Sequence, residues 1–358
     1  MRGLANTVAR LSAARHSIRQ TMSNVGTGRL VQMKDFGSNP GNLHAWTFVP
    51  TGLSEAAPLV VVLHGCTQQA ALYDYGSGWS TLAEREGFAL LYPEQQRANN
   101  SNLCFNWYSA SDARRGQGEA KSISQMVTHL IAAHSLDSAR VFITGLSAGG
   151  AMTSVMLAAY PDLFAGGAII AGIPFASADT LPDALARMRG QAPGRDQLAA
   201  RARASVKDHR PLPTLSVWHG TRDTIVDPLN ADWIVDQWRD LHEVGTHPGT
   251  IQNIGPHRHE TWRDERGRAV VERYDIAGMG HGTPLDSRGD SGCGAAGSHM
   301  LEAGICSTRR IANSWGIARS DIVPGAAVQP SAPVAGIARP ADVQSIIEDA
   351  LREAGLMR

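Results

Sequence analysis

The segment VFITGLSAGGAM, residues 141–152, constrains the fold more than any other stretch of the chain. It places Ser147 between Gly145 and Gly149, after a β-branched and aromatic run and before a run of small residues. The first run favours a strand and the second allows a helix to begin at once, so the serine lies on a sharp strand-to-helix turn. Such a turn aims the serine at the positive end of the helix. The pattern predicts a nucleophilic serine, and an ordinary turn of small residues is the alternative.

Strand-like and helix-like segments alternate on both sides of this motif. Strands are expected at 43–50, 58–65, 87–93, 139–145, 166–172, 213–220 and 268–276, and helices at 78–87, 118–135, 147–161 and 229–243. Several strand segments are continuous apolar runs, which is typical of a sheet covered on both faces. The alternation predicts an α/β domain with a doubly wound, mainly parallel sheet and helices on both faces.

The chain divides into four parts by composition. Residues 1–29 form a basic N-terminal segment, and residues 30–320 form the expected catalytic domain. Within that domain, 177–211 is a polar, helix-prone insert that we interpret as a small lid or cap. An Ala/Pro-rich linker follows at 321–340. The amphipathic helix expected at 341–358 either packs on the domain or binds a partner.

The overall charge excludes several classes of function. The 33 basic and 33 acidic residues cancel, so no overall field attracts nucleic acid or an anionic membrane. No stretch offers the roughly 18 apolar residues of a membrane span. Arginines interrupt the first 34 residues, which therefore lack the apolar stretch of a secretory signal. These features predict a cytoplasmic protein.

The four cysteines match no zinc or redox motif in their spacing, so neither a metal nor a cofactor is predicted from them. Cys293 and Cys306 lie close together in a glycine-rich segment and could pair. A reducing compartment argues against disulfides. The residues alone leave this question open.

A nucleophilic serine requires a base, and the base requires an orienting acid. Asp223 is the first acid after a strand that ends at His219 and Gly220, and Asp227 is the less favoured alternative. His281 lies between two glycines after the last strand, which lets its imidazole reach a cleft from a loop. We therefore expect Asp223 as the acid and His281 as the base. The histidines set aside as bases are His257, His259 and His299, and His64 and His219 are interpreted as structural.

The negative oxygen formed during attack on a carbonyl needs two backbone N–H donors. The residue after the nucleophile, Ala148, supplies one of them. The loop after the strand that ends at His64 and Gly65 supplies the other, the amide of Cys66. Trp107 and Ile173 are candidates for the substrate-binding surface, and packing within the fold is the alternative for both.

Six motifs together resemble the polyhydroxybutyrate depolymerase family of esterases, which is related to feruloyl and acetylxylan esterases of the α/β-hydrolase fold. They are LHGCTQ (63–68), NLCFNWYSASDARRGQGEAKSI (102–123), ITGLSAGGAM (143–152), AGIPFASA (171–178), WHGTRDTIVDPLNA (218–231) and GMGHGTPL (278–285). The resemblance extends from about residue 30 to residue 317. It implies hydrolysis of poly(3-hydroxybutyrate) or its oligomers without metal or cofactor, with Ser147, Asp223 and His281 as the triad. Cys66 and Cys104 recur as a pair in the resemblance and could form a bridge beside the site.

The chain departs from the commoner family pattern in one region. Residues 280–300 are polar and glycine-rich, where many relatives carry a tryptophan-rich stretch. This departure argues against crystalline polymer as a substrate, whereas oligomers, amorphous polymer and small esters stay open, and a granule surface is a candidate partner. The rival functions are a feruloyl, acetylxylan or short-chain carboxylesterase, a prolyl-oligopeptidase-like peptidase and a non-catalytic granule-binding protein.

Overall fold

The computed structural model describes the central part of the chain. The described residues are 28–191, 193–206, 211–245, 249–288 and 292–319. One compact unit spans Thr27–Ser320. The basic segment except Gly28 and Arg29, the linker at 321–340 and the helix expected at 341–358 lie outside the described residues.

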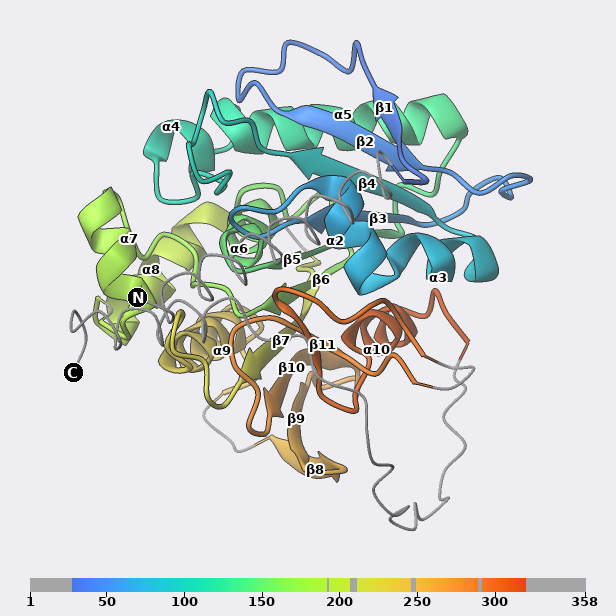
Figure 1. Cartoon of the computed structure of the whole chain (residues 1–358). Helices are drawn as coiled ribbons and strands as arrows, with labels where there is room; N and C mark the ends of the chain where they lie inside the picture. The colour runs from blue at the N-terminus through green and yellow to red at the C-terminus, as the bar shows by residue number, and fades with distance from the viewer. Residues whose placement is uncertain (1–27, 192, 207–210, 246–248, 289–291, 320–358) are drawn as a thin grey trace, which may run out of the picture. The chain divides into compact units, whose positions relative to one another are not determined.

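A ten-stranded sheet forms the centre of the described structure, in the order β1-β2-β4-β3-β5-β6-β7-β10-β9-β8 (Figure 1). The six neighbours from β4 to β10 are parallel, and the strands at both edges are antiparallel. The strands are Val31–Met33 (β1), His44–Phe48 (β2), Leu59–Leu63 (β3), Ala89–Glu94 (β4), Val141–Leu146 (β5), Gly166–Ile170 (β6), Thr214–Gly220 (β7), Thr250–Ile254 (β8), His257–Arg263 (β9) and Ala269–Ile276 (β10). The predicted mainly parallel sheet is confirmed.

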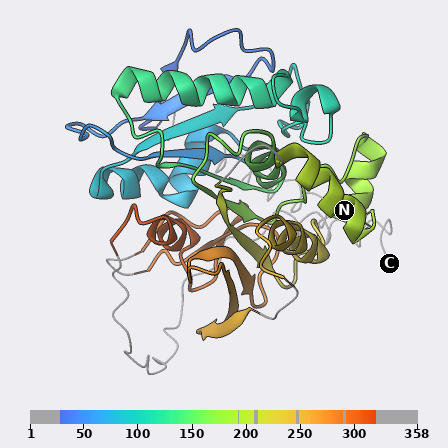
Figure 2. The same ribbon diagram turned by 180° about the vertical axis from the view of Figure 1, so that it is seen from behind.

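Helices cover both faces of this sheet, as Figures 1 and 2 show from opposite sides. Helices α5, α6, α8 and α9 lie on one face, and α2, α3 and α10 lie on the other. The helices are Ala70–Ser77 (α2), Trp79–Glu86 (α3), Ala110–Ala113 (α4), Gly118–His134 (α5), Ala148–Ala159 (α6), Leu181–Met188 (α7), Arg195–Val206 (α8), Leu229–Leu241 (α9) and Ser307–Ser314 (α10).

The central strand β3 shows why its sequence is apolar at every position. Leu59, Val61 and Leu63 belong to the apolar cluster on one face of the sheet. Val60 and Val62 belong to the cluster on the other face. Successive side chains of a strand point to opposite faces, so a strand covered by helices on both sides has no solvent-facing position.

The insert at 177–211 contains two helices, α7 and α8, between β6 and β7. Helix α8 is fastened to its neighbours: Ser205 Oγ donates to the carbonyl of Ala158 in α6, and Gln237 Nε2 of α9 donates to the carbonyl of Leu198. The predicted helical insert is therefore present, with α8 packed on the domain. Its role as a lid stays a prediction.

The antiparallel pair β8 and β9 has no counterpart among the predicted strands. Several buried positions of β9 are polar, including His257, His259 and Glu260. His259 Nε2 lies 2.7 Å from Glu272 Oε2 of β10, so the strand is held partly by a polar pair. A strand stabilised in this way lacks the apolar alternation by which strands are recognised in a sequence.

The glycines of the serine motif permit a very close approach of α6 to β3. A Cβ on Gly149 would lie 2.4 Å from the carbonyl oxygen of Leu63 and 2.5 Å from that of His64. A Cβ on Gly145 would lie 2.4 Å from the carbonyl oxygen of Gly149. These contacts involve main-chain atoms, which cannot rotate away as a side chain can. Glycine is therefore required for steric reasons at both positions.

We expect Gly149→Ala to lower the free energy of unfolding by about 3 kcal/mol, because the added methyl group forces backbone apart in a packed core. Urea unfolding followed by circular dichroism measures the change. Gly297→Ala is the matched control, because no atom lies within 4 Å of a Cβ built at that position. Equal stability of the two variants would contradict the steric explanation.

Candidate active site

Ser147 lies at the turn between β5 and α6. Its backbone has φ 56° and ψ −116°, which is a strained conformation for a residue with a side chain. The Ser147 amide donates to the carbonyl of Ile170 at the end of β6, at 2.9 Å. Its side chain makes no capping bond to α6. The turn therefore holds the backbone of Ser147 and leaves its hydroxyl free of the helix.

Hydrogen bonds beyond the strand ends join the loops at this edge of the sheet. The Ala171 amide donates to the carbonyl of Trp218 at 2.8 Å, which ties β6 to β7. The Arg222 amide donates to the carbonyl of Met279 at 3.0 Å, which ties the loop after β7 to the loop after β10. Because β5, β6, β7 and β10 are parallel neighbours, the loops after their carboxyl ends meet at one edge.

Asp223 and His281 form a direct pair at that edge. The distance between His281 Nδ1 and Asp223 Oδ2 is 2.7 Å. The other carboxylate oxygen, Oδ1, accepts from the amides of Ile225 and Val226, both at 2.9 Å. Burial by itself raises the pKa of Asp223, but hydrogen bonds from His219 and His281 outweigh it and hold that pKa below its ordinary value. Asp223 is therefore ionised and fixes the orientation of the His281 ring.

His219 is a second histidine against the same carboxylate. Its Nε2 lies 3.3 Å from Asp223 Oδ2 and 2.9 Å from the carbonyl oxygen of Val226. The sequence predicts a structural role for His219. The structure adds that its ring lies directly against the carboxylate of Asp223. The one sequence signal for this contact is its spacing of four residues before Asp223 at a strand end.

Asp227, the alternative acid, has a different task. Its Oδ1 accepts from the Leu229 amide at 2.9 Å, at the first residue of α9. Its own amide donates to the carbonyl of Met188 at 2.8 Å, which joins this segment to the end of α7. His281 is thus paired with Asp223, and Asp227 accepts a hydrogen bond at the start of α9.

The loop that carries His281 is held from its other side by His299. The distance between His299 Nδ1 and the carbonyl oxygen of His281 is 3.1 Å, and the two rings meet edge to face with centroids 5.7 Å apart. The short parallel strands Thr283–Leu285 (β11) and Met300–Glu302 (β12) continue this connection. His299, which we set aside as a base, therefore contacts the predicted base.

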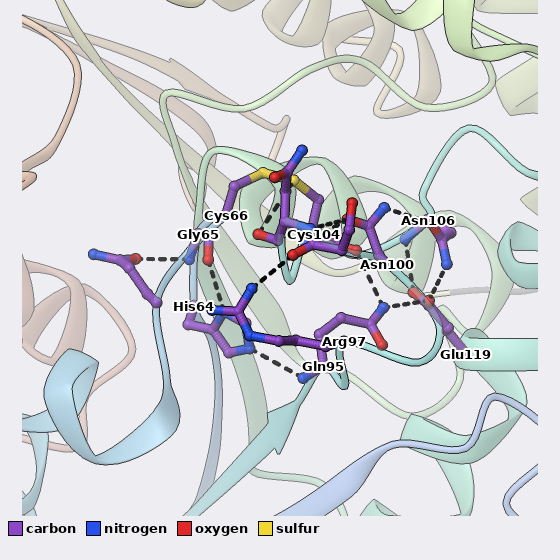
Figure 3. The surroundings of a disulfide bond; sticks show 12 residues. His64, Gly65, Cys66, Gln95, Arg97, Asn100, Cys104, Asn106 and Glu119 are labelled. Carbon is purple, nitrogen blue, oxygen red and sulfur yellow. Dashed lines mark hydrogen bonds between the residues drawn. A yellow bond between two sulfur atoms is a disulfide. The ribbon is translucent and has the colours of Figure 1, made fainter.

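The predicted oxyanion amides belong to neighbouring segments. Ala148 is the first residue of α6, where amides have no partner within the helix. A Cβ on Gly65 would lie 3.5 Å from the carbonyl oxygen of Leu146, so the loop with Cys66 passes beside the serine turn. Among the described residues, the Cys66 amide donates no hydrogen bond. The thiol of Cys66 is not free, because it is bonded to Cys104 (Figure 3).

The two candidates for substrate contact are buried. Trp107 is 9% exposed and packs edge-on against Tyr108, and Ile173 is 2% exposed. Both belong to the apolar cluster that contains α5 and α6. Both side chains therefore contribute to packing, and their contact with substrate stays a prediction.

Both disulfides that the sequence left open are present, Cys66–Cys104 and Cys293–Cys306. No cysteine is left as a nucleophile or metal ligand. The described residues contain no cluster of three or more His, Cys, Asp or Glu that could hold a metal ion. Disulfides are typical of oxidising compartments, so they do not favour the predicted cytoplasmic location, which stays a prediction. No helix among the described residues is long and apolar enough to cross a membrane.

Comparisons with known proteins point to one family. A family model described as Esterase PHB depolymerase matches residues 43–267. Poly(3-hydroxyalkanoate) depolymerase C of Paucimonas lemoignei is 45% identical over 294 residues, which cover 80% of this chain and 70% of that protein. Acetylxylan esterase A of Aspergillus oryzae is 36% identical over 219 residues, which cover 59% of this chain and 70% of that protein. The solved acetyl xylan esterase from Aspergillus awamori is similar with a TM-score of 0.65 and 28% identity, over 70% of this chain and 93% of that one.

We expect Asp223→Asn to lower kcat for p-nitrophenyl butyrate by about 10⁴-fold, because an amide holds the base in the wrong tautomer. Asp227→Asn is the matched control and should stay within about threefold of the unmodified enzyme, since Asp227 contacts α9 rather than His281. The reverse order of effects would assign the acid to Asp227. Steady-state kinetics on both variants decides between the two carboxylates.

Proposed function

This chain belongs to the Esterase PHB depolymerase family and is a carboxylic ester hydrolase, and on that premise we propose that it hydrolyses poly(3-hydroxybutyrate) or its oligomers. The observation that carries the proposal is the 2.7 Å contact between Asp223 and His281, at the sheet edge where Ser147 turns into α6. An acid, a base and a serine in this chain order are typical of hydrolases with a serine turn.

The proposed reaction proceeds through an acyl-enzyme. His281 accepts the proton of Ser147 as the serine oxygen attacks the ester carbonyl, and the amides of Cys66 and Ala148 bind the negative oxygen. The carbonyl re-forms, the alcohol leaves with the proton from His281, and the acyl group stays on Ser147. Water then attacks the acyl-enzyme with His281 again as base, and release of the acid restores the serine.

The ionised Asp223 stabilises the imidazolium that forms in each step. Two imidazole N–H groups and two backbone amides surround its carboxylate, so its negative charge is localised without a metal or an arginine. His219 contributes to this set and holds the acid from a second side. Its role is support of the acid rather than proton transfer.

A second candidate function is hydrolysis of acetylated sugars. The similarity to the acetyl xylan esterase from Aspergillus awamori favours it, because that protein shares the fold over 70% of this chain. The triad chemistry is the same for both substrates, and the surface around the site decides between them.

Four exposed apolar side chains, on α7 and on the segment that follows Asp223, favour the polyester. Leu181 and Leu185 lie one turn apart on α7 and are 54% and 45% exposed. Ile225 and Leu229 follow Asp223 and are 40% and 47% exposed. The bond from the Asp227 amide to the carbonyl of Met188 joins these two segments. We call these four side chains the rim patch.

The rim patch suits contact with a polyester surface. A 3-hydroxybutyrate chain carries a methyl group on every unit, and apolar side chains gain free energy when such groups cover them. An acetylated sugar polymer carries methyl groups only on its acetyl groups, among ring hydroxyl groups that gain nothing from leucine and isoleucine. These exposed side chains support adsorption to polymer, including a granule surface.

We expect the unmodified protein to hydrolyse p-nitrophenyl butyrate and a soluble 3-hydroxybutyrate trimer, and Ser147→Ala to lose at least about 10⁵-fold in kcat on both. Acetylated xylo-oligosaccharide is the parallel substrate. Cleavage of the acetylated sugar without cleavage of the trimer would transfer the proposal to the second candidate. Cleavage of none of the three would overturn the ester-hydrolase mechanism at Ser147.

We expect the double variant Leu185→Ser/Leu229→Ser to lose about tenfold or more in the rate on amorphous poly(3-hydroxybutyrate) film, since two exposed leucines contribute about 1–3 kcal/mol of adsorption. Its rate on the soluble trimer should be unchanged, because the patch acts on adsorption rather than on chemistry. Ile251→Ser is the control, because Ile251 is 53% exposed on the edge strand β8. An equal loss for the control would show a general surface effect and contradict the role of the rim patch.

A further inference from the structure

We propose that Glu119, a buried carboxyl group at the start of α5, is a positioning residue for the oxyanion hole. Hydrogen bonds lead from it to both sides of the Cys66 amide, along the network drawn in Figure 3. The proposal rests on the proposed function, in which that amide binds the negative oxygen. Glu119 is 1% exposed and its carboxyl group accepts from Gln95 and Asn106, so it acts through other residues.

The first path leads through the disulfide partner of Cys66. Gln95 Nε2 donates to Glu119 Oε1 at 2.6 Å and to the carbonyl of Cys104 at 3.1 Å. Cys104 is covalently joined to Cys66. The carboxyl group therefore orients the Gln95 amide, which holds the backbone to which Cys66 is bonded.

Asn106 and Asn100 hold the same loop from its other side. The Asn106 amide donates to Glu119 Oε2 at 2.9 Å, and Asn106 Nδ2 donates to Oε1 at 2.8 Å. Asn100 Nδ2 donates to Asn106 Oδ1 at 3.0 Å, and Asn100 Oδ1 accepts from the Cys104 amide at 3.3 Å. Both polar backbone groups of Cys104 are thus held by side chains that belong to the Glu119 network.

The second path reaches the oxyanion peptide itself. The Gln95 amide donates to His64 Nε2 at 3.1 Å, which leaves the proton of the neutral ring on Nδ1. His64 Nδ1 donates to the carbonyl of Gly65 at 2.7 Å. That carbonyl and the Cys66 N–H belong to one planar peptide group, so holding the oxygen sets the direction of the N–H. Burial lowers the pKa of His64, which keeps the ring neutral and this arrangement intact.

The carboxyl group of Glu119 is needed as an acceptor on both oxygens. Three N–H groups converge on it, and the described residues place no arginine or lysine in a salt bridge with it. Burial raises the pKa of Glu119 to about 8, against the opposing effect of the Asn106 amide. A carboxyl oxygen accepts hydrogen bonds whether or not the group is protonated, whereas the amide nitrogen of glutamine accepts none. Glu119→Gln therefore removes one acceptor at any pH.

The test compares Glu119→Gln with the unmodified enzyme on p-nitrophenyl butyrate at pH 7 and pH 9. We expect kcat to fall by about 10- to 100-fold at both pH values with KM changed less than about twofold, because a misplaced oxyanion donor weakens only the transition state. The inhibition constant of an alkyl boronic acid, which places an oxygen in the oxyanion hole, should rise by a similar factor. Asn100→Ala is the second variant, with an expected loss in kcat of about tenfold. It removes the bonds of Asn100 to the Cys104 amide and to Asn106 and leaves the Glu119 carboxyl group in the protein.

Asp74→Asn is the matched control for loss of a buried carboxyl group. Asp74 is 5% exposed and accepts from Tyr92 and Ser80, outside the Glu119 network. We expect Asp74→Asn to lower the melting temperature and to leave kcat within about twofold of that of the unmodified enzyme. Thiol titration confirms that the Cys66–Cys104 bond is intact in every variant.

Three results overturn the proposal. One is a kcat within about twofold of the unmodified enzyme in Glu119→Gln and Asn100→Ala, while Ser147→Ala is inactive; this leaves the proposed function standing. Another is a loss of kcat in Asp74→Asn that matches Glu119→Gln, which would make the effect one of general stability. The third is full activity of Ser147→Ala, which overturns the proposed function together with this inference.

Discussion

The close approach of helix α6 to strand β3 is the contact on which the site depends. The backbone of Gly149 lies against the carbonyl groups of Leu63 and His64, with no room for a side chain. This contact sets the position of Ser147, which directly precedes the helix, relative to Gly65 and Cys66 in the loop that follows the strand. The parallel order β5-β6-β7-β10 then brings Asp223 and His281 to the same edge through bonds between strand ends. The proposed reaction therefore depends on small residues at one contact between a helix and a strand.

The buried polar groups at this edge of the sheet show that the candidate site includes interactions that are unfavourable for stability. Asp223 is satisfied by four N–H groups, and its ionised form is favoured despite burial. His219, which supports it, has a buried Nδ1 without a hydrogen-bond partner among the described residues. An unsatisfied buried nitrogen costs about 1–3 kcal/mol. This unfavourable free energy arises at the residue that orients Asp223. Apolar burial in the clusters on both faces of the sheet offsets it.

The parts of the structure that could be predicted from sequence are those with a local signature. The apolar run of β3 and the glycines around Ser147 are each visible within a few residues, and the order of Ser147, Asp223 and His281 follows from the strand ends that precede them. The pairing of β8 with β9 could not be predicted, because polar partners such as Gln252 and His259 contact each other across these strands. The support of Asp223 by His219 depends on a ring orientation that no spacing specifies. Pairing of the four cysteines likewise depends on which loops meet in space.

The loop with Gly65 and Cys66 shows why directional contacts accompany apolar packing in this fold. Apolar burial is non-directional, so it can hold a loop at a depth without setting the angle of one N–H group. Hydrogen bonds weaken steeply as their angles depart from linearity, and so they transmit orientation. The peptide between Gly65 and Cys66 is held at its carbonyl by His64 and through a covalent bond to Cys104. Each of these holders is itself oriented by Gln95, and Gln95 is oriented by Glu119. Burial of the Glu119 carboxyl group is unfavourable by itself. Its three N–H partners satisfy it, and through them it holds this loop in one orientation.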